Sequence, residues 1–199
     1  QSARFIGDRL YLVTFQQIDP LFVIDIANPR KPTILGELKM PGYSTYLHPY
    51  DATHLIGVGY DTFTNDHGGT QNGGVKIDLY NVADVHNPKK EGSLTLGDGG
   101  SYSEVLNNPR AFVWYKEKNL LLMPVTLMTN AKNPNDPYMV SKTFQGLVGV
   151  SITPGSVVEK FRMSHISLTD TIRSEWKKQC AEYTKTNTVY EPYIPSHCK

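Results

Sequence analysis

The sequence predicts an all-β protein made of repeated antiparallel sheets, and three observations support this class. At an offset of 56 residues, FVIDIANPRKPTILGEL (residues 22–38) lies over DLYNVADVHNPKKEGSL (residues 78–94) without a gap. Twelve tyrosines, sixteen glycines and thirteen prolines among 199 residues suit short strands joined by tight turns. Short apolar runs also recur along the chain, bounded by Gly, Pro, Asn and Asp.

The repeat preserves the residues that turns and close contacts require. Each copy is a β-rich run, a polar turn with proline and a second β-rich run. Strand pairs that recur at a fixed period are typical of propellers and other β-repeat architectures. Four aligned positions are identical: Ala27 and Ala83, Pro32 and Pro88, Gly36 and Gly92, Leu38 and Leu94.

Three units follow one another, at residues 4–40, 45–96 and 102–163. The strands predicted for them are 5–6, 10–15, 21–26 and 34–40; then 45–47, 54–59, 75–82 and 92–96; then 111–115, 120–125, 146–153 and 157–163. A hairpin turn is predicted at 116–119, and long polar loops at 61–74 and 128–141. Loops in equivalent places emerge on one face, which makes that face the leading candidate for binding.

Four short strands are the content of one propeller blade. We therefore predict a β-propeller segment over residues 1–165, with about three four-stranded antiparallel blades that form part of a larger propeller. Propellers close their ring with four to eight blades. Other chains, or copies of this chain, are the partners predicted to complete it.

The end of the chain, residues 166–199, predicts a short helix and an extended tail. Ile172, Trp176 and Tyr183 fall at helical spacing, which predicts a helix over 171–183. Cys180 and Cys198 are the two cysteines, and a disulfide between them would imply an oxidising compartment. The alternative is two unrelated thiols.

Charge and processing signals limit the function classes. A net charge of +1 gives no electrostatic reason to expect binding to nucleic acid or an anionic membrane. No apolar run approaches the length of a transmembrane segment. The sequence starts at Gln1 and enters strand-like sequence at once, so we expect a chain processed from a longer precursor.

Four long segments support a family resemblance: RFIGDRLYLVTF, DPLFVIDIANPRKPTILGELKMPG, STYLHPYDATHLIGVGYDT and GSYSEVLNNPRAFVWYKEKNLLLMPV. Together they resemble the secreted proteins with a C-terminal β-propeller domain, distantly related to WD40 repeats. The resemblance covers residues 4–165 and implies a secreted or surface-displayed bacterial or archaeal protein. It brings no catalytic residues. The chain departs from the family pattern after His165, where IRSEWKKQCAEYTKTNTVYEPYIPSHCK follows.

Two groups of side chains are candidate binding residues. Asp61, Asn65 and Asp66 offer oxygen ligands beside Gly68 and Gly69, as a calcium site requires. The alternative is a solvated polar loop. A second group is aromatic, and it could bind carbohydrate or peptide; the alternative, which we favour, is packing between blades. Its members are Tyr43, Tyr46, Tyr50, Tyr60 and Phe63.

Two functions remain open at this stage. The first is a non-catalytic secreted or cell-surface propeller that serves in extracellular assembly or in ligand or protein binding. The second is an extracellular hydrolase with an acidic site in the propeller channel, which calcium could assist. Its candidate acids are Asp61, Asp66, Asp98 and Glu104. The first is favoured because the sequence contains none of the catalytic motifs that we sought.

Overall fold

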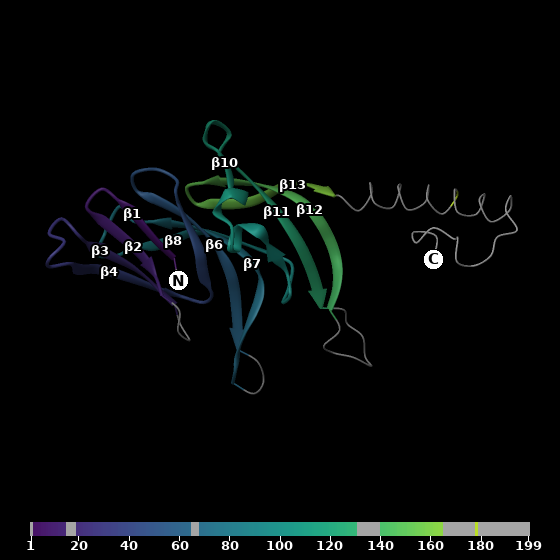
Figure 1. Ribbon diagram of the computed structural model, residues 1–199, viewed down its shortest axis with the longest axis horizontal. Helices are drawn as coiled ribbons and strands as arrows, with labels where there is room; N and C mark the ends of the chain where they lie inside the picture. The colour runs from purple at the N-terminus through teal and green to yellow at the C-terminus, as the bar shows by residue number, and fades with distance from the viewer. Residues whose placement is uncertain (1, 15–18, 65–67, 131–139, 165–177, 179–199) are drawn as a thin grey trace, which may run out of the picture. The chain divides into compact units, whose positions relative to one another are not determined.

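The computed structural model describes residues 2–14, 19–64, 68–130, 140–164 and 178. The chain divides into two units, Gln1–Met163 and Ser164–Lys199, and the three β-sheets belong to the first unit (Figure 1). Among the described residues, no helix has the length and apolar character needed to cross a bilayer. Apart from Lys178, which is helical, the helix predicted over 171–183 and the Cys180–Cys198 bond lie outside the described residues and stay predictions.

The first two sheets are antiparallel meanders of four consecutive strands. The first contains β1 (Ser2–Ile6), β2 (Arg9–Val13), β3 (Asp19–Asp25) and β4 (Thr33–Met40). The second contains β5 (Tyr43–Pro49), β6 (His54–Thr64), β7 (Thr70–Asn81) and β8 (Lys89–Leu96). The predicted all-β class with four-stranded antiparallel units is confirmed.

The third sheet has a fifth, short strand. Its main path is β10 (Val113–Tyr115), β11 (Leu120–Asn130), β12 (Val140–Thr153) and β13 (Ser156–Ser164), and β9 (Tyr102–Ser103) also pairs with β11. Two 3-10 helices, η1 (Glu104–Leu106) and η2 (Pro109–Ala111), separate β9 from β10. The predicted strand 111–115 was therefore too long at its start.

The interruption between β9 and β10 follows from local capping. The Ser103 side chain accepts a hydrogen bond from the Val105 amide, and the Asn108 side chain accepts one from the Arg110 amide. Pro109 begins η2, where a missing N–H costs nothing. At the other end of β10, η3 (Lys116–Lys118) and the left-handed Asn119, at φ 49°, form the predicted turn.

The sequence repeat is a structural repeat at the level of register. Val23 pairs with Gly36, and the register shifts directly after Val23. The positions 56 residues later behave alike: Leu79 pairs with Gly92, and the register shifts after Leu79. The aligned prolines and glycines therefore mark a bulged strand pair that the chain builds twice.

Gly36 and Gly92 also share a role between sheets. A Cβ on Gly36 would collide with the carbonyl of Val85, in the turn between β7 and β8. A Cβ on Gly92 would lie 2.7 Å from Cγ2 of Val157, at the start of β13. In both cases a glycine on the fourth strand of one sheet allows close approach of the next sheet, by the turn before its fourth strand or by the start of that strand.

Two hydrophobic cores hold the three sheets together. The core between the first and second sheets contains Tyr11, Val13, Leu21, Val23, Met40, Leu47, Leu55, Tyr80 and Val82. The core between the second and third sheets includes Ile56, Val58, Val75, Ile77 and Leu79 from one side and Leu121, Met123, Val125, Val148 and Val150 from the other. Because β7 alternates its side chains between the two cores, the second sheet is buried on both faces.

The predicted loop at 61–74 was wrong in extent, because most of its residues lie in paired strands, and the described ends of the predicted loop at 128–141 are paired as well. In the second sheet, Thr62 pairs with Asn72 and Thr64 with Thr70. In the third, Met128 pairs with Lys142 and Asn130 with Val140. Figure 1 shows the β6–β7 and β11–β12 hairpins extending in the same direction, beyond the cores.

Gly57 and Gly59 allow close packing within the second sheet. A Cβ on Gly57 would lie 2.6 Å from the Tyr80 ring and would also meet the Ser44 hydroxyl. A Cβ on Gly59 would collide with the Tyr43 carbonyl of the neighbouring strand β5. The glycines leave room for a buried tyrosine and for a β5 backbone that curves over β6.

Candidate functional site

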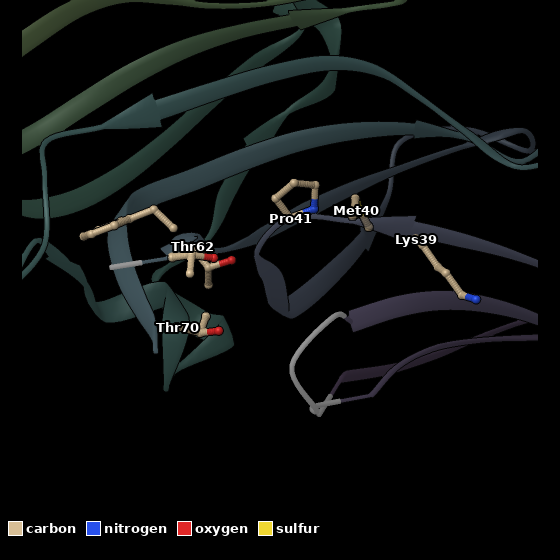
Figure 2. Close-up of a pocket in the computed structure, with 7 residues that line it drawn as sticks. Lys39, Met40, Pro41, Thr62 and Thr70 are labelled. Carbon is tan, nitrogen blue, oxygen red and sulfur yellow. The ribbon is translucent and has the colours of Figure 1, made fainter. Parts of the chain in front are cut away.

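A pocket of about 420 Å³ lies beside the β6–β7 hairpin (Figure 2). Lys39, Met40 and Pro41 line it from the end of β4 and the link that follows. The hairpin contributes Thr62, Phe63, Thr64 and Thr70. Its size is in the range of small-ligand pockets, which combine an apolar lining with a few polar groups.

The pocket walls are held by contacts between the two sheets. The Gly42 amide donates a hydrogen bond of 2.8 Å to the Thr62 hydroxyl. The Lys39 ammonium lies 3.2 Å from a Glu37 carboxylate oxygen and is largely exposed. Phe63 leaves 47% of its surface exposed, so its ring is available to a ligand.

The structure separates the aromatic residues that the sequence singled out. The Tyr43 and Tyr60 rings are neighbours, with centroids 5.8 Å apart, while Phe63 lines the pocket. Burial, together with the nearby Tyr43 and Tyr102, raises the pKa of Tyr60 above its ordinary value, so its hydroxyl stays protonated. Tyr46 packs on Phe112 of the third sheet, with ring centroids 5.0 Å apart.

Asp61 lies in β6, opposite Gly73 and Gly74 at a break in the strand register. A Cβ on Gly73 would lie 3.4 Å from the Cβ of Asp61, which is ordinary van der Waals contact. Asn65 and Asp66 lie outside the described residues. Within the described part of the chain, no group of three or more His, Cys, Asp or Glu residues could hold a metal ion.

The other two candidate acids lie on the segment between the second and third sheets. Asp98 starts a tight turn, in which the Ser101 amide donates to the Asp98 carbonyl at 3.1 Å. Glu104 accepts a hydrogen bond of 3.0 Å from the Tyr102 hydroxyl at the start of η1. The described contacts do not join Asp98 and Glu104 with Asp61 into one cluster.

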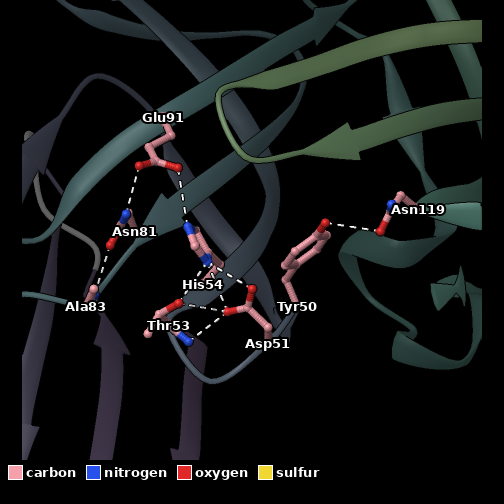
Figure 3. Close-up of polar contacts among 8 residues, drawn as sticks. All are labelled: Tyr50, Asp51, Thr53, His54, Asn81, Ala83, Glu91 and Asn119. Atoms are coloured by element: carbon pink, nitrogen blue, oxygen red, sulfur yellow. Dashed lines mark hydrogen bonds and ion pairs between the residues drawn. The ribbon is translucent and has the colours of Figure 1, made fainter. Parts of the chain in front are cut away.

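A polar cluster that the sequence did not suggest ties the β5–β6 turn to β8 (Figure 3). Nδ1 of His54 lies 2.9 Å from an Asp51 oxygen, and Nε2 lies 3.3 Å from Oε2 of Glu91. The contact with Glu91 has an ion-pair distance without hydrogen-bond geometry. The other oxygen of Glu91 accepts a 2.7 Å bond from Asn81. With both ring nitrogens facing carboxylates, His54 is a structural tie.

Asp51 is the exposed end of this cluster. Partial burial is the strongest influence and acts to raise its pKa, but it is outweighed. Hydrogen bonds from the Thr53 amide, from His54 and from the Thr53 hydroxyl hold the pKa of Asp51 below its ordinary value. The turn therefore keeps a carboxylate next to His54 even in mild acid.

A second unpredicted network is buried on the face of the second sheet that packs on the first. Lys76 and Asp78 are 3% and 1% exposed, with Nζ 3.4 Å from the carboxylate. The Lys76 ammonium also donates to the Pro41 carbonyl, in the link between the sheets. Tyr80 donates to Asp78 at 2.9 Å. The alternation Lys76, Asp78, Tyr80 along one strand is the signal that could have revealed it.

The chain belongs to the β-propeller domain family, which it matches over residues 1–191. This agrees with the packing of β1 against β5, the first strands of the first two sheets, and of β5 against η1. A propeller domain of this kind suggests a role in protein binding or in structure.

Two archaeal proteins are similar to part of the chain. Uncharacterized protein MJ1554 of Methanocaldococcus jannaschii is 40% identical over 123 residues, which is 62% of this chain and 18% of that protein. An uncharacterized protein of Archaeoglobus fulgidus is 38% identical over 123 residues, with the same coverage of both chains. The alignment thus spans about a fifth of the length of the curated relatives.

Proposed function

We propose that this chain is a non-catalytic extracellular assembly module, which works by burying its outer sheet faces against further β-sheets. The observation that carries the proposal is an apolar row across the outer face of the first sheet. Phe5 pairs with Leu10, Leu10 with Ile24, and Ile24 with Ile34. The two ends of the row, Phe5 and Ile34, are 66% and 64% exposed.

The outer face of the third sheet has a similar character. Val113 pairs with Leu122, and Leu122 with Gly149. The Phe161 ring covers Gly149, while Val113 and Phe161 are 51% and 38% exposed. Apolar surface of this extent marks an interaction site on a soluble protein.

The way in which neighbouring sheets of the chain pack on one another indicates what would cover these outer faces. Leu55 and Tyr80 are directly opposite one another in the second sheet, and this face is buried on the first sheet. Leu10 and Ile24 are the corresponding opposed pair in the first sheet. The occupant that fits is therefore another four-stranded sheet, supplied by another chain or by a copy of this one. The exposed turn at residues 27–34 would approach its outer strand.

Sedimentation velocity of the 199-residue chain, with and without the double substitution Phe5→Glu/Ile34→Glu, tests the proposal. We expect the parent to associate or to bind an apolar dye, and the double variant to lose most of both. Phe63→Glu is the matched control, because Phe63 is similarly exposed but lies in a hairpin. A 22.3 kDa monomer without dye binding would overturn the proposal.

We further propose a calcium site built by Asp61, Asn65 and Asp66. A carboxylate opposite two glycines in a register break, followed closely by two more oxygen-bearing side chains, supports it. Calorimetry should show calcium binding that Asp61→Ala/Asp66→Ala abolishes and Asp84→Ala, in another turn, retains. Equal heats from the parent and the double variant would argue against this site.

The extracellular location rests on the resemblance to secreted proteins and on Cys180 and Cys198 as a potential disulfide. Peptide mapping of protein prepared without reductant should recover the two cysteine peptides as one linked species. Two free thiols would remove this support. No described contact favours the hydrolase alternative.

A further inference from the structure

Arg4 is held in one position at the junction of the first two sheets. It lies in β1, opposite Tyr11, on the face that packs on the second sheet. Its Nε donates a 3.0 Å hydrogen bond to the Leu47 carbonyl, and its terminal NH2 group donates a 3.3 Å bond to the Tyr46 hydroxyl. The guanidinium carbon lies 5.7 Å from the centre of the Tyr46 ring. Three contacts therefore fix the group and leave its second terminal nitrogen without a hydrogen-bond partner among the described residues.

The charge of Arg4 is not balanced. Arg9 lies 2.9 Å from an Asp25 oxygen, and Arg162 lies 2.6 Å from a Glu159 oxygen. No described carboxylate comes within the 4.0 Å of an ion pair with Arg4, although Arg4 is half-buried. A guanidinium that has lost part of its hydration gains from a carboxylate, with which it can form two parallel hydrogen bonds.

His48 extends the site. The Tyr46 hydroxyl lies 3.2 Å from Nδ1 of His48. Because Arg4 can only donate, the Tyr46 oxygen accepts from it, and the phenolic hydrogen is free for Nδ1 of His48. This arrangement places the imidazole hydrogen on Nε2, which has no partner among the described residues. Arg4 and His48 thus both keep N–H donors that no described residue uses.

The surroundings strengthen any electrostatic interaction here. The Phe112 ring packs 4.6 Å from the His48 ring and 5.0 Å from the Tyr46 ring, which shields one side from water. Burial first, and the Arg4 charge second, lower the pKa of His48, so the imidazole is neutral at pH 7. No described carboxylate is among the groups that influence the pKa of His48. The site therefore carries one positive charge.

We propose that Arg4, with His48 beside it, binds a single carboxylate group where the first strands of the sheets converge. One uncompensated charge matches a monoanion better than a phosphate dianion. Arg4 forms the ion pair, and His48, joined to Arg4 through the Tyr46 hydroxyl, senses the change in charge. The carboxylate comes either from a small organic acid or from an acidic side chain of a protein that docks there.

The test is NMR titration of His48 in the 199-residue chain, with acetate or a blocked tripeptide that contains one glutamate as the probe. Chloride at equal ionic strength, and the same peptide with glutamine, are the reference solutions. Since Arg4 lowers the pKa of His48, a bound carboxylate should raise that pKa saturably, by about one unit. In Arg4→Gln the starting pKa should already be higher and should no longer respond to either probe.

Two further variants separate binding from folding. Arg4→Lys keeps the positive charge but cannot form two parallel hydrogen bonds with a carboxylate. We expect about tenfold weaker binding, while the pKa of His48 still rises when the probe binds. Arg9→Gln removes a paired arginine elsewhere in the first sheet and should change nothing. A response to both probes indicates a small organic acid as sufficient, and a response to the peptide alone indicates a protein side chain. No saturable response to either probe in the folded parent overturns the proposal.

Discussion

The two seams between the three sheets share one repeat but differ in chemistry. The seam between the first and second sheets encloses the charged pair Lys76 and Asp78, each at most 3% exposed. The seam between the second and third sheets encloses an apolar core, and its buried serines, Ser101 and Ser103, bond to backbone carbonyls. Among the described residues, no charged side chain is buried in this second seam.

This difference shows that one strand can serve two kinds of interface. Ile77 and Asp78 are neighbours in β7 and face opposite seams, because strand side chains alternate. The apolar seam is stabilised by burial, which depends on volume and is not directional. The charged seam also has an apolar core, but its Lys76–Asp78 pair is tolerated only while both partners are present, because an unpaired buried charge is costly.

The largest effect should come from Asp78→Ala. The substitution leaves the Lys76 ammonium buried without its carboxylate and leaves Tyr80 and Ser93 without their acceptor. We expect a loss of about 3–5 kcal/mol in the free energy of unfolding, measured by urea denaturation. The double variant Lys76→Met/Asp78→Leu should recover most of it, since it removes both charges. A double variant as unstable as the single one would show that the charge is not the cause.

Ile77→Ala should cost less than Asp78→Ala while acting on the other seam. Its side chain is fully buried in the apolar core, and its truncation leaves a cavity there. We expect about 3 kcal/mol by the same urea measurement. Ile77→Val should cost about 1 kcal/mol. If both losses vanish, the third sheet does not pack on the second in solution.

The smallest effect concerns the stability in acid that Asp51 contributes at the β5–β6 turn. Because the folded pKa of Asp51 lies below its ordinary value, its contribution is present above about pH 3.9 and is lost as the pH falls through the folded pKa. Asp51 is well exposed, so we expect less than about 1 kcal/mol. Urea denaturation midpoints measured from pH 6 to pH 2.5 should fall less steeply for Asp51→Asn than for the parent. The midpoints of the control Asp8→Asn should fall as they do in the parent.

The sequence predicted the parts of the fold that local composition determines. Gly36 and Gly92 kept the same spacing from their turns, so the repeated strand pair was visible. The outer β6–β7 hairpin was not visible, because Thr62, Thr64 and Thr70 pair beyond the cores and show no apolar alternation. Backbone pairing alone extends these strands, and it leaves no signature in side-chain type.

The sites were harder to predict because their partners are distant in sequence. His54 and Glu91 are 37 positions apart, and Arg4 and Tyr46 are 42 apart, so no local pattern links them. The aromatic group was visible as a cluster in the sequence, but the structure distributes its members between the pocket and the seams. Composition identified candidate residues, whereas the sheet register determined their neighbours.

The glycine contact between sheets has a consequence for how such a chain can grow. The second repeat carries both halves of the contact: Gly92 on its fourth strand, and the turn before that strand, which fits against Gly36. In a duplicated second repeat, the turn of the copy could therefore meet Gly92 of its parent, although the face with Lys76 and Asp78 would then lie on an apolar face. A tandem copy of residues 45–96, inserted after Leu96, should add one sheet to the stack and leave the existing seams unchanged.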